Sequence, residues 1–385
     1  MRIVLFQGKS RYNLLSFWTD ELYKAFKKLN VDVVKVNLID QSSYQADLAI
    51  ALSKPADLFF SFNGIGGELE KDSFFTRLMT PFWQFFCDHP FHHVNRLNIQ
   101  SPYLIPSFTG KEHIEAFNAL YLNRLSLEIP HAGSSLDSIP GVHKKRSLPL
   151  VLFGSYTPPE EIEEKWKGYL PSHRQLLKEQ VAKGLETQVY DPFKLLVEAF
   201  KDNQIYLDSQ HLLKLKLIYV ELESYFRNYF RKKLLNHFEK MDLSIHLFGD
   251  GFEKLETSLH IKHNALSYEA MVGTLSDCQI VLGTCPVFPK ASHERPLTAM
   301  IQGALAATEK NQFFDNAFNK DELLLYTWQN LNELGDSVKE LLGNEKKRLE
   351  IAERGQKKTV SHYSFNQLAE TIVARAPYLL NVTRI

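Results

Sequence analysis

The sequence has only three cysteines, Cys87, Cys278 and Cys285, and no two of them form a CxxC pair. An odd number at these spacings argues against a disulfide framework and indicates a reducing compartment. No uninterrupted apolar stretch approaches the ~18 residues needed to span a bilayer. The apolar run after Met1 is also too short for the core of a signal peptide. We therefore expect a cytoplasmic protein, and leave contact with a membrane surface open.

The sequence also lacks an excess of charge of either sign, because its 45 Lys and Arg residues balance its 45 Asp and Glu residues. Such a chain has no global field that would attract nucleic acid or an anionic membrane. Two local basic runs, residues 143–146 and 227–233, are typical of a linker and of a solvated helix face. We therefore expect no nucleic-acid partner.

Internal repeats and low-complexity tracts are absent, and 385 residues are too many for one ordinary core. The first forty residues alternate between a buried strand (2–8), a helical pattern (13–30) and a second strand (31–38). Strand, helix and strand at this spacing predict a right-handed crossover and a parallel sheet. The alternation continues, so residues 1–147 are predicted to form one doubly wound domain.

A Ser-, Gly- and Pro-rich linker, residues 133–147, precedes a second series of strands. Within that series, a helical insertion is expected at about 159–240. The predicted fold class is α/β, with two Rossmann-like doubly wound domains facing a cleft. The two domains are expected at residues 1–147 and 148–364. Residues 365–385 are expected to form a closing helix that crosses back to the first domain. Ligands bind at the carboxyl ends of parallel strands, which places the strand-end loops on the cleft walls.

The loop "FSFNGIGGE" of the first domain follows an apolar strand. Asn63, Gly64, Gly66 and Gly67 are candidates for the acceptor-side wall, because glycines let backbone N–H groups approach a ligand closely. The motif is not GxGxxG, and a flexible turn explains it equally well. His131, in a later loop, is assigned to the same wall.

The segment "CDHPFHH" follows another predicted strand. Asp88 and His89 are the candidate catalytic residues, since a carboxylate or imidazole at a strand end can act as a general base. Structural histidines are the alternative reading. His92 and His93 also raise the question of a metal, but Pro90 disrupts a regular ligand spacing, so no metal site is expected.

Two loops of the second domain end predicted strands. "LFGSYTPP" offers Gly154, Ser155 and Tyr156, and "FGDGFE" offers Gly249 and Gly251. Small residues and a hydroxyl suit a nearby phosphate or sugar. Gly249 and Gly251 could admit a diphosphate or merely close a tight turn.

Two predicted helix starts follow. In "NALSYEAM", Ser267 is expected to be a helix N-cap, and Tyr268 either stacks on a base or fills the core. In "KASHERPLTAM", three ionisable residues, His293, Glu294 and Arg295, precede a buried helix. The N-terminus of a helix is an anion site and Arg suits phosphate, so we expect these three to bind a nucleotide. A structural ion pair is the alternative.

The runs "IHLFGDGFE", "HNALSYEAMVGTLSDCQIVLG" and "HERPLTAMIQGALAAT" together resemble GT-B glycosyltransferases of the group-1-like type, particularly the CgeB-like spore-protein branch. The resemblance covers about 148–375. It implies a nucleotide-sugar donor on the second domain and an acceptor on the first, with no bound cofactor or metal. Glu294 would hold the ribose, and His293 and Arg295 would lie near the diphosphate.

The same resemblance places Tyr268 near the base and Gly154, Ser155, Gly249 and Gly251 along the donor site. The chain departs from the family at one point: retaining members of the wider group carry two glutamates, and the matching positions here are Lys290 and Thr298. The stereochemistry therefore stays open.

The expected function is transfer of a sugar, of the hexosyl or a related kind, from a nucleoside diphosphate to an unidentified glycan, protein or lipid acceptor. A nucleotide-sugar epimerase or hydrolase, an inactive nucleotide-sugar-binding protein and a metal hydrolase are the alternatives. The aromatic residues at 219–230 of the insertion favour core packing, with a homodimer interface or an acceptor-recognition surface as further options.

Overall fold

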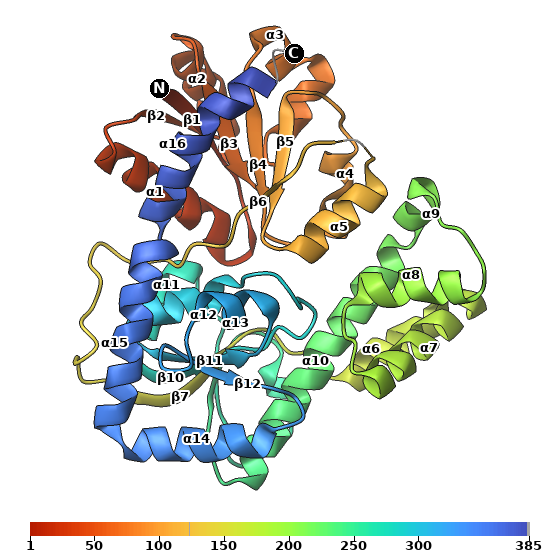
Figure 1. Ribbon diagram of the computed structural model, residues 1–385, viewed down its shortest axis with the longest axis vertical. Helices are drawn as coiled ribbons and strands as arrows, with labels where there is room; N and C mark the ends of the chain where they lie inside the picture. The colour runs from red at the N-terminus through yellow and green to blue at the C-terminus, as the bar shows by residue number, and fades with distance from the viewer. Residues whose placement is uncertain (123, 383–385) are drawn as a thin grey trace.

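The computed structural model describes residues 1–122 and 124–382 and has two parallel sheets (Figure 1). The strand order is β2-β1-β3-β4-β5-β6 in the first sheet and β12-β11-β10-β7-β8-β9 in the second. Every neighbouring pair in both sheets runs parallel. The predicted α/β class with two doubly wound halves is confirmed.

The first sheet lies within residues 2–128. Its strands are β1 (Arg2–Gln7), β2 (Asp32–Asn37), β3 (Leu58–Phe62), β4 (Phe82–Phe86), β5 (Leu104–Phe108) and β6 (Leu127–Glu128). Its helices are α1 (Leu14–Lys28), α2 (Gln41–Leu52), α3 (Phe74–Leu78), α4 (Val94–Leu97) and α5 (Lys111–Leu120). Every residue of β1, β3, β4 and β5 is buried, as expected for central strands covered by helices on both faces.

The second sheet begins at Leu148. Its strands are β7 (Leu148–Phe153), β8 (His246–Phe248), β9 (Ile261–His263), β10 (Cys278–Leu282), β11 (Leu305–Glu309) and β12 (Leu324–Tyr326). The helices around it are α11 (Tyr268–Leu275), α12 (Glu294–Ile301), α13 (Gln312–Ala317), α14 (Leu331–Gly343) and α15 (Glu345–His362).

The helical insertion connects β7 to β8. It contains α6 (Pro159–Lys165), α7 (Pro171–Thr187), α8 (Pro192–Asp202), α9 (Ser209–Lys214) and α10 (Lys216–Lys240). Figure 1 shows that α10 runs back along the second sheet, while α6 to α9 stand to one side of both domains. The aromatic residues of α10 include buried Tyr219, Phe226 and Phe230, so core packing accounts for them.

The last helix, α16 (Phe365–Val382), returns to the first domain and packs against α1 (Figure 1). Phe365 lies beside Trp18 of α1, with 6.5 Å between the ring centroids. Within the described part of the chain, no helix combines the length and the apolar character that crossing a membrane requires.

Candidate functional site

A small cavity of about 150 Å³ lies at the carboxyl ends of β7 and β8, against the loop after β1. Its wall contains Tyr12, Leu14, Phe153, Gly154, Ser155, Phe248, Gly249, Ala265, Leu266, Tyr268, Met271, Glu294 and Arg295. The structure thus brings together most of the second-domain residues selected from the sequence. Gly251, Tyr156 and His293 do not line this cavity.

The two glycine loops pack directly on each other. A Cβ atom on Gly249, whose φ is +148°, would lie 1.6 Å from the carbonyl oxygen of Gly154. A Cβ on Gly251, at φ +89°, would lie 1.8 Å from the carbonyl oxygen of Tyr156. Both glycines are therefore required by backbone contact between the loops after β7 and β8, and this contact shapes the floor of the cavity.

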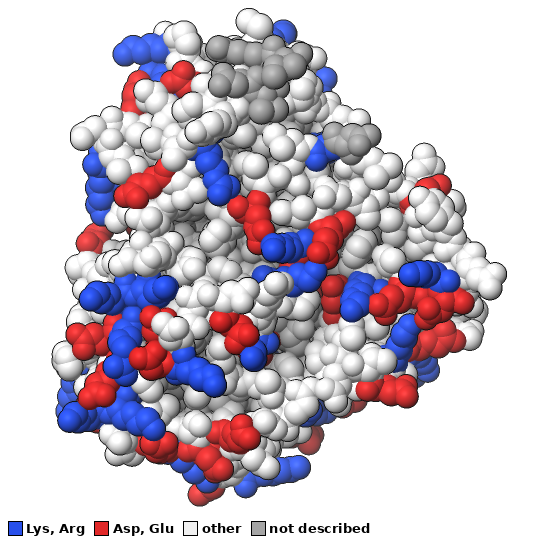
Figure 2. Space-filling view, viewed as in Figure 1, with Lys and Arg blue, Asp and Glu red and all other residues white. Residues whose placement is uncertain are grey.

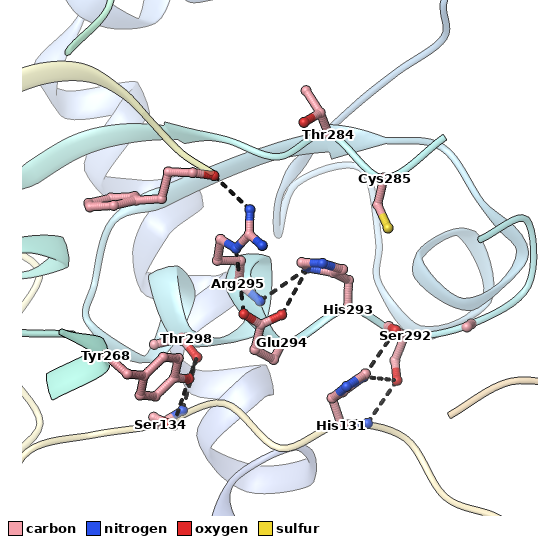
Figure 3. Close-up of polar contacts among 12 residues, drawn as sticks. His131, Ser134, Tyr268, Thr284, Cys285, Ser292, His293, Glu294, Arg295 and Thr298 are labelled. Carbon is pink, nitrogen blue, oxygen red and sulfur yellow. Dashed lines mark hydrogen bonds and ion pairs between the residues drawn. The ribbon is translucent and has the colours of Figure 1, made fainter. Parts of the chain in front are cut away.

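The three ionisable residues at the start of α12 form one cluster (Figure 3). His293 is the N-cap, and its Nδ1 accepts a hydrogen bond from the Arg295 backbone N–H and lies 3.1 Å from Glu294 Oε2. Arg295 Nε lies 3.5 Å from Glu294 Oε1, and its guanidinium donates to the Phe153 carbonyl at the end of β7 over 2.6 Å. The carboxylate is thus held at the cavity wall between two fixed neighbours.

The cluster is almost fully buried, and its charges follow from that. Burial lowers the pKa of His293 to about 3, so the imidazole is neutral at pH 7. Burial alone would raise the pKa of Glu294, but its contacts with His293 and the positive charge of Arg295 outweigh this and lower it to about 2. Glu294 is therefore an ionised acceptor beside a permanent cation.

Arg231 of α10 is a second buried cation at this site, and sequence reasoning missed it. Its guanidinium donates to the Ser155 carbonyl and, over 3.1 Å, to Thr284 Oγ1. Burial and the nearby charge of Arg295 lower the pKa of Arg231 to about 9. The expectation that residues 227–233 form a solvated face is wrong for Arg231, because α10 is covered by the sheet on that side.

The run at 143–146 is likewise not all solvated, since buried Arg146 donates to the Gln302 carbonyl.

Tyr268 lies between the two domains. Its hydroxyl is 3.0 Å from Ser134 Oγ and 3.4 Å from Thr298 Oγ1 (Figure 3). Its ring packs on Trp18, with 5.9 Å between the ring centroids. Only 3% of Tyr268 is exposed, which favours a core role over stacking on a base. Tyr156 is equally buried and stacks on Phe252, away from the cavity. The predicted N-cap at Ser267 is confirmed, since its hydroxyl accepts from the Ala270 N–H.

On the first domain, Asp88 follows β4 and is half exposed. Its Oδ2 lies 3.5 Å from His93 Nε2 and accepts a 3.4 Å hydrogen bond from Asn63. Burial would raise the pKa of Asp88, but His93, with smaller contributions from His92 and Arg227, lowers it below the ordinary value. The carboxylate is ionised at neutral pH, and Arg227 of α10 is close enough to act on it.

His89 has a different environment. Its ring stacks on Tyr219 of the insertion with 4.2 Å between centroids, and Nδ1 accepts from the Phe91 N–H. Only 3% of His89 is exposed, and burial holds its pKa well below the ordinary value. Because the imidazole is enclosed away from solvent, the structure favours Asp88 over His89 as the base.

The glycine loop after β3 is packed inward. Cβ atoms on Gly64, Gly66 and Gly67 would strike the side chains of Phe86, Phe6 and Gln84 respectively, each within 2.8 Å. All three glycines are buried. The structure therefore gives them a turn role, and Asn63, which holds Asp88, is the member of this group nearest to the chemistry.

His131 joins the two domains through the loop before α12. Its backbone N–H donates to Ser292 Oγ over 2.7 Å, and its Nδ1 lies 3.0 Å from the Ser292 carbonyl (Figure 3). Burial lowers the pKa of His131, so the ring is neutral. Its ring centroid lies 6.4 Å from that of His293, so the loop of His131 packs next to the cluster.

The two positions that carry glutamates in retaining relatives are structural here. Lys290 pairs with Glu115 of α5 at 2.7 Å, and Thr298 Oγ1 accepts from the Ser134 N–H. Across residues 1–122 and 124–382, no group of three or more His, Cys, Asp or Glu side chains could hold a metal ion.

Comparison with solved structures identifies the fold. The chain aligns with T4 phage BGT in complex with its UDP-glucose substrate, at 13% identity and a TM-score of 0.55, over 98% of this chain and 99% of that one. An alpha-glucosyltransferase solved with UDP-glucose and DNA containing an abasic site aligns at 11% identity and a TM-score of 0.54, over 98% and 99%. The fold is that of the GT-B glycosyltransferases.

Residues 227–374 match the protein family described as "Glycosyl transferase-like". This segment contains Arg231, β8 with the Gly249 loop, β10 with the loop that leads to Glu294, and helices α14 and α15. The chain also aligns with the crystal structure of TarM, over 87% of this chain but 57% of that one, at 11% identity and a TM-score of 0.47. No curated protein sequence matches the chain. The expected resemblance to GT-B glycosyltransferases is confirmed, and the spore-protein branch stays a prediction.

Proposed function

We propose that this GT-B protein is a hexosyltransferase that uses a uridine diphosphate sugar as its donor. The observation that carries the proposal is the ionised carboxylate of Glu294, held by His293 and Arg295 at the wall of the cavity above β7 and β8. The solved GT-B structures that share this fold contain UDP-glucose, which supports the choice of donor. No bound cofactor is proposed.

The donor would lie along the carboxyl edge of the second sheet. A buried, ionised carboxylate suits the two hydroxyls of a ribose, because charge-assisted hydrogen bonds are short and strong. The diphosphate needs compensating cations, and Arg231 and Arg295 supply them from α10 and α12. Both guanidinium groups are already fixed by backbone carbonyls, so little side-chain entropy is lost when they bind the phosphate. His293 stays neutral, and its Nδ1 accepts from the Arg295 backbone N–H at the start of α12.

We propose Asp88 as the general base of an inverting reaction. The acceptor hydroxyl would attack the anomeric carbon, its proton would pass to Asp88, and the bond from that carbon to the diphosphate oxygen would break. The leaving diphosphate would be stabilised by the two arginines, which removes the need for a metal. If the enzyme retains configuration, the donor phosphate itself would take the acceptor proton and Asp88 would be dispensable.

The test is nucleotide release from UDP-glucose and other nucleoside diphosphate sugars, by the wild type and by Asp88→Asn. Asp137→Asn is the control, since that exposed side chain lies in the linker. A general base contributes about 10²–10⁴-fold, so Asp88→Asn should lower the transfer rate by that factor and leave UDP affinity unchanged. Release without transfer to any acceptor would indicate a hydrolase or epimerase, and nucleotide binding without release an inactive binding protein.

A further inference from the structure

A second cavity in the described chain is separate from the candidate donor site. It has a volume of about 680 Å³ and lies between α5 of the first domain, α8 of the insertion and the loops that follow β10 and β12. That volume is in the range of small-molecule binding sites, roughly 300–1,000 Å³. Three parts of the chain that are far apart in sequence therefore build one pocket.

One wall of the pocket is aromatic. Tyr190, Phe193 and Trp328 line it, and they come from the insertion and from the loop after β12. Phe230 of α10 backs this wall, with ring centroids 4.2 Å from Tyr190 and 4.6 Å from Trp328. The rings are thus held in place before any ligand arrives, and flat apolar faces of this kind suit the C–H face of a sugar ring.

The lining also contains a buried carboxyl group with unused hydrogen-bonding capacity. Glu112 is 5% exposed, and its Oε1 accepts from the backbone N–H groups of Lys290 and Ala291 at 3.1 and 2.8 Å. Its Oε2 is buried and has no hydrogen-bond partner in the structure. A buried polar atom without a partner is costly, and a ligand hydroxyl in this pocket would satisfy it.

The charges around the pocket argue against an anionic ligand. Three of the lining lysines are paired: Lys290 with Glu115 at 2.7 Å, Lys310 with Asp315 at 3.1 Å and Lys194 with Glu198 at 3.9 Å. The fourth, Lys201, creates no excess of positive charge, because five Asp and Glu residues line the pocket against four Lys residues. Figure 2 shows Lys and Arg interspersed with Asp and Glu across the middle of this face, without a broad patch of one sign. A phosphate or a nucleic acid would require an excess of free cations, whereas a neutral polyol would not.

The pocket adjoins the site proposed for the donor diphosphate. Cys285 lines the pocket, and the preceding residue, Thr284, accepts the hydrogen bonds of Arg231 (Figure 3 labels both). Phe288, another lining residue, packs under Arg227 and lies 6.5 Å from His293 between ring centroids. A molecule in the pocket would therefore lie beside the proposed donor site.

We propose that this pocket is the acceptor site and that the acceptor is a neutral saccharide. The role of the pocket as an acceptor site rests on the proposed function. The class of ligand rests on the aromatic wall, the free oxygen of Glu112 and the paired lysines. The sugar ring would stack on the aromatic wall and donate a hydroxyl hydrogen bond to Glu112.

The experiment is saturation-transfer NMR on the full chain in the presence of UDP. The probes are methyl glycosides of glucose, galactose, mannose and N-acetylglucosamine, together with maltose and cellobiose. Val197→Trp fills the pocket from α8, and Glu112→Gln neutralises the free carboxyl group with little change in shape. Glu179→Gln, on the exposed face of α7, is the matched control.

At least one saccharide should bind to the wild type and to the control, and its affinity should fall at least tenfold in Val197→Trp and severalfold in Glu112→Gln. UDP affinity should be the same in all four proteins. If the wild type binds no saccharide, or if saccharide binding survives both substitutions, the inference is overturned. The proposed function still stands in that case, provided that the wild type binds UDP. If Val197→Trp abolishes saccharide binding but the wild type binds no nucleotide, the acceptor role and the proposed function are refuted instead.

Discussion

Replacing Gly249 with alanine tests the contact between the two loops that form the floor of the candidate donor cavity. The new Cβ would lie 1.6 Å from the Gly154 carbonyl oxygen, in a backbone conformation at φ +148° that other residues rarely adopt. The loops must then separate, which breaks the hydrogen bonds from Gly154 N–H to the Phe248 carbonyl (2.9 Å) and from Tyr156 N–H to the Asp250 carbonyl (2.8 Å).

The size of the effect follows from those contacts. Two lost hydrogen bonds cost about 1–3 kcal/mol together, and the strained backbone costs about 1–3 kcal/mol more. With a Tm change of about 2–4 °C per kcal/mol for a domain of this size, the Tm should fall by at least about 4 °C.

The assay is thermal unfolding followed by circular dichroism, with UDP titrations on the same samples. Gly168→Ala is the control, because no atom lies within 4 Å of a Cβ built there. The control should keep its Tm, and Gly249→Ala should also bind UDP more weakly. Equal Tm values for the two variants would refute the reasoning, since the loops would then be able to part without loss.

Three further predictions concern charge. Arg231→Lys keeps one positive charge but cannot make both hydrogen bonds, to the Ser155 carbonyl and to Thr284 Oγ1, that fix the guanidinium. The affinity for UDP should therefore fall about tenfold while the affinity for uridine is unchanged. Equal losses of affinity for both ligands would contradict a role in binding the diphosphate. Asp250→Ala removes the shared acceptor of Arg11 and Tyr12 that links the domains, so UDP should associate faster in stopped-flow measurements. The Tm should change little because Arg11 and Asp250 are 65% and 48% exposed, and an unchanged association rate would show that this contact does not gate the cavity. The pKa of Glu294 in the folded state is lowered from 4.5 to about 2, so its contribution to stability is complete above pH 4.5 and is lost as the pH falls toward 2. The urea midpoints of the wild type and of Glu294→Gln should therefore differ by a constant amount between pH 8 and pH 5. A difference between the midpoints that narrows within that range would be inconsistent with an ionised Glu294.

Much of the fold could be predicted because its signals are local. The apolar runs that became β1, β4, β7 and β10 are short and bounded by turn residues, and the helix at Leu14–Lys28 buries Leu15, Trp18 and Leu22 on one side. Two short edge strands, β9 and β12, were missed because three residues each give too little pattern. Their pairing is decided by the neighbouring strand and not by their own sequence.

The site could be predicted only where one segment supplies the chemistry. His293, Glu294 and Arg295 are consecutive, so their grouping at a helix start was visible in the sequence. Arg231 was not visible, because a basic run on a helix is usually solvated and only the fold shows that α10 turns this side chain under Ser155. The choice between Asp88 and His89 also needed the structure, since adjacent residues on a loop can face opposite ways.

The large pocket could not be predicted at all. Glu112 meets the backbone of Ala291 across a separation of 179 residues, and the aromatic wall joins the insertion to the loop after β12. No local periodicity encodes such a meeting. The insertion itself was recognised, and an acceptor-recognition surface was one of the options for it, but its partner residues depend on how the two domains close.

The measurement that tests the central claim most directly is a calorimetric titration of UDP into the wild type, Glu294→Gln and Glu253→Gln, with GDP and ADP as comparison ligands. Glu253 is an exposed residue of the neighbouring loop, so its variant should behave as the wild type does. Loss of a charge-assisted hydrogen bond costs about 1.5–3 kcal/mol, so Glu294→Gln should bind UDP about 10- to 150-fold more weakly. A folded wild type that binds none of the three nucleotides, or a Glu294→Gln variant with the affinity of the wild type, would contradict the account.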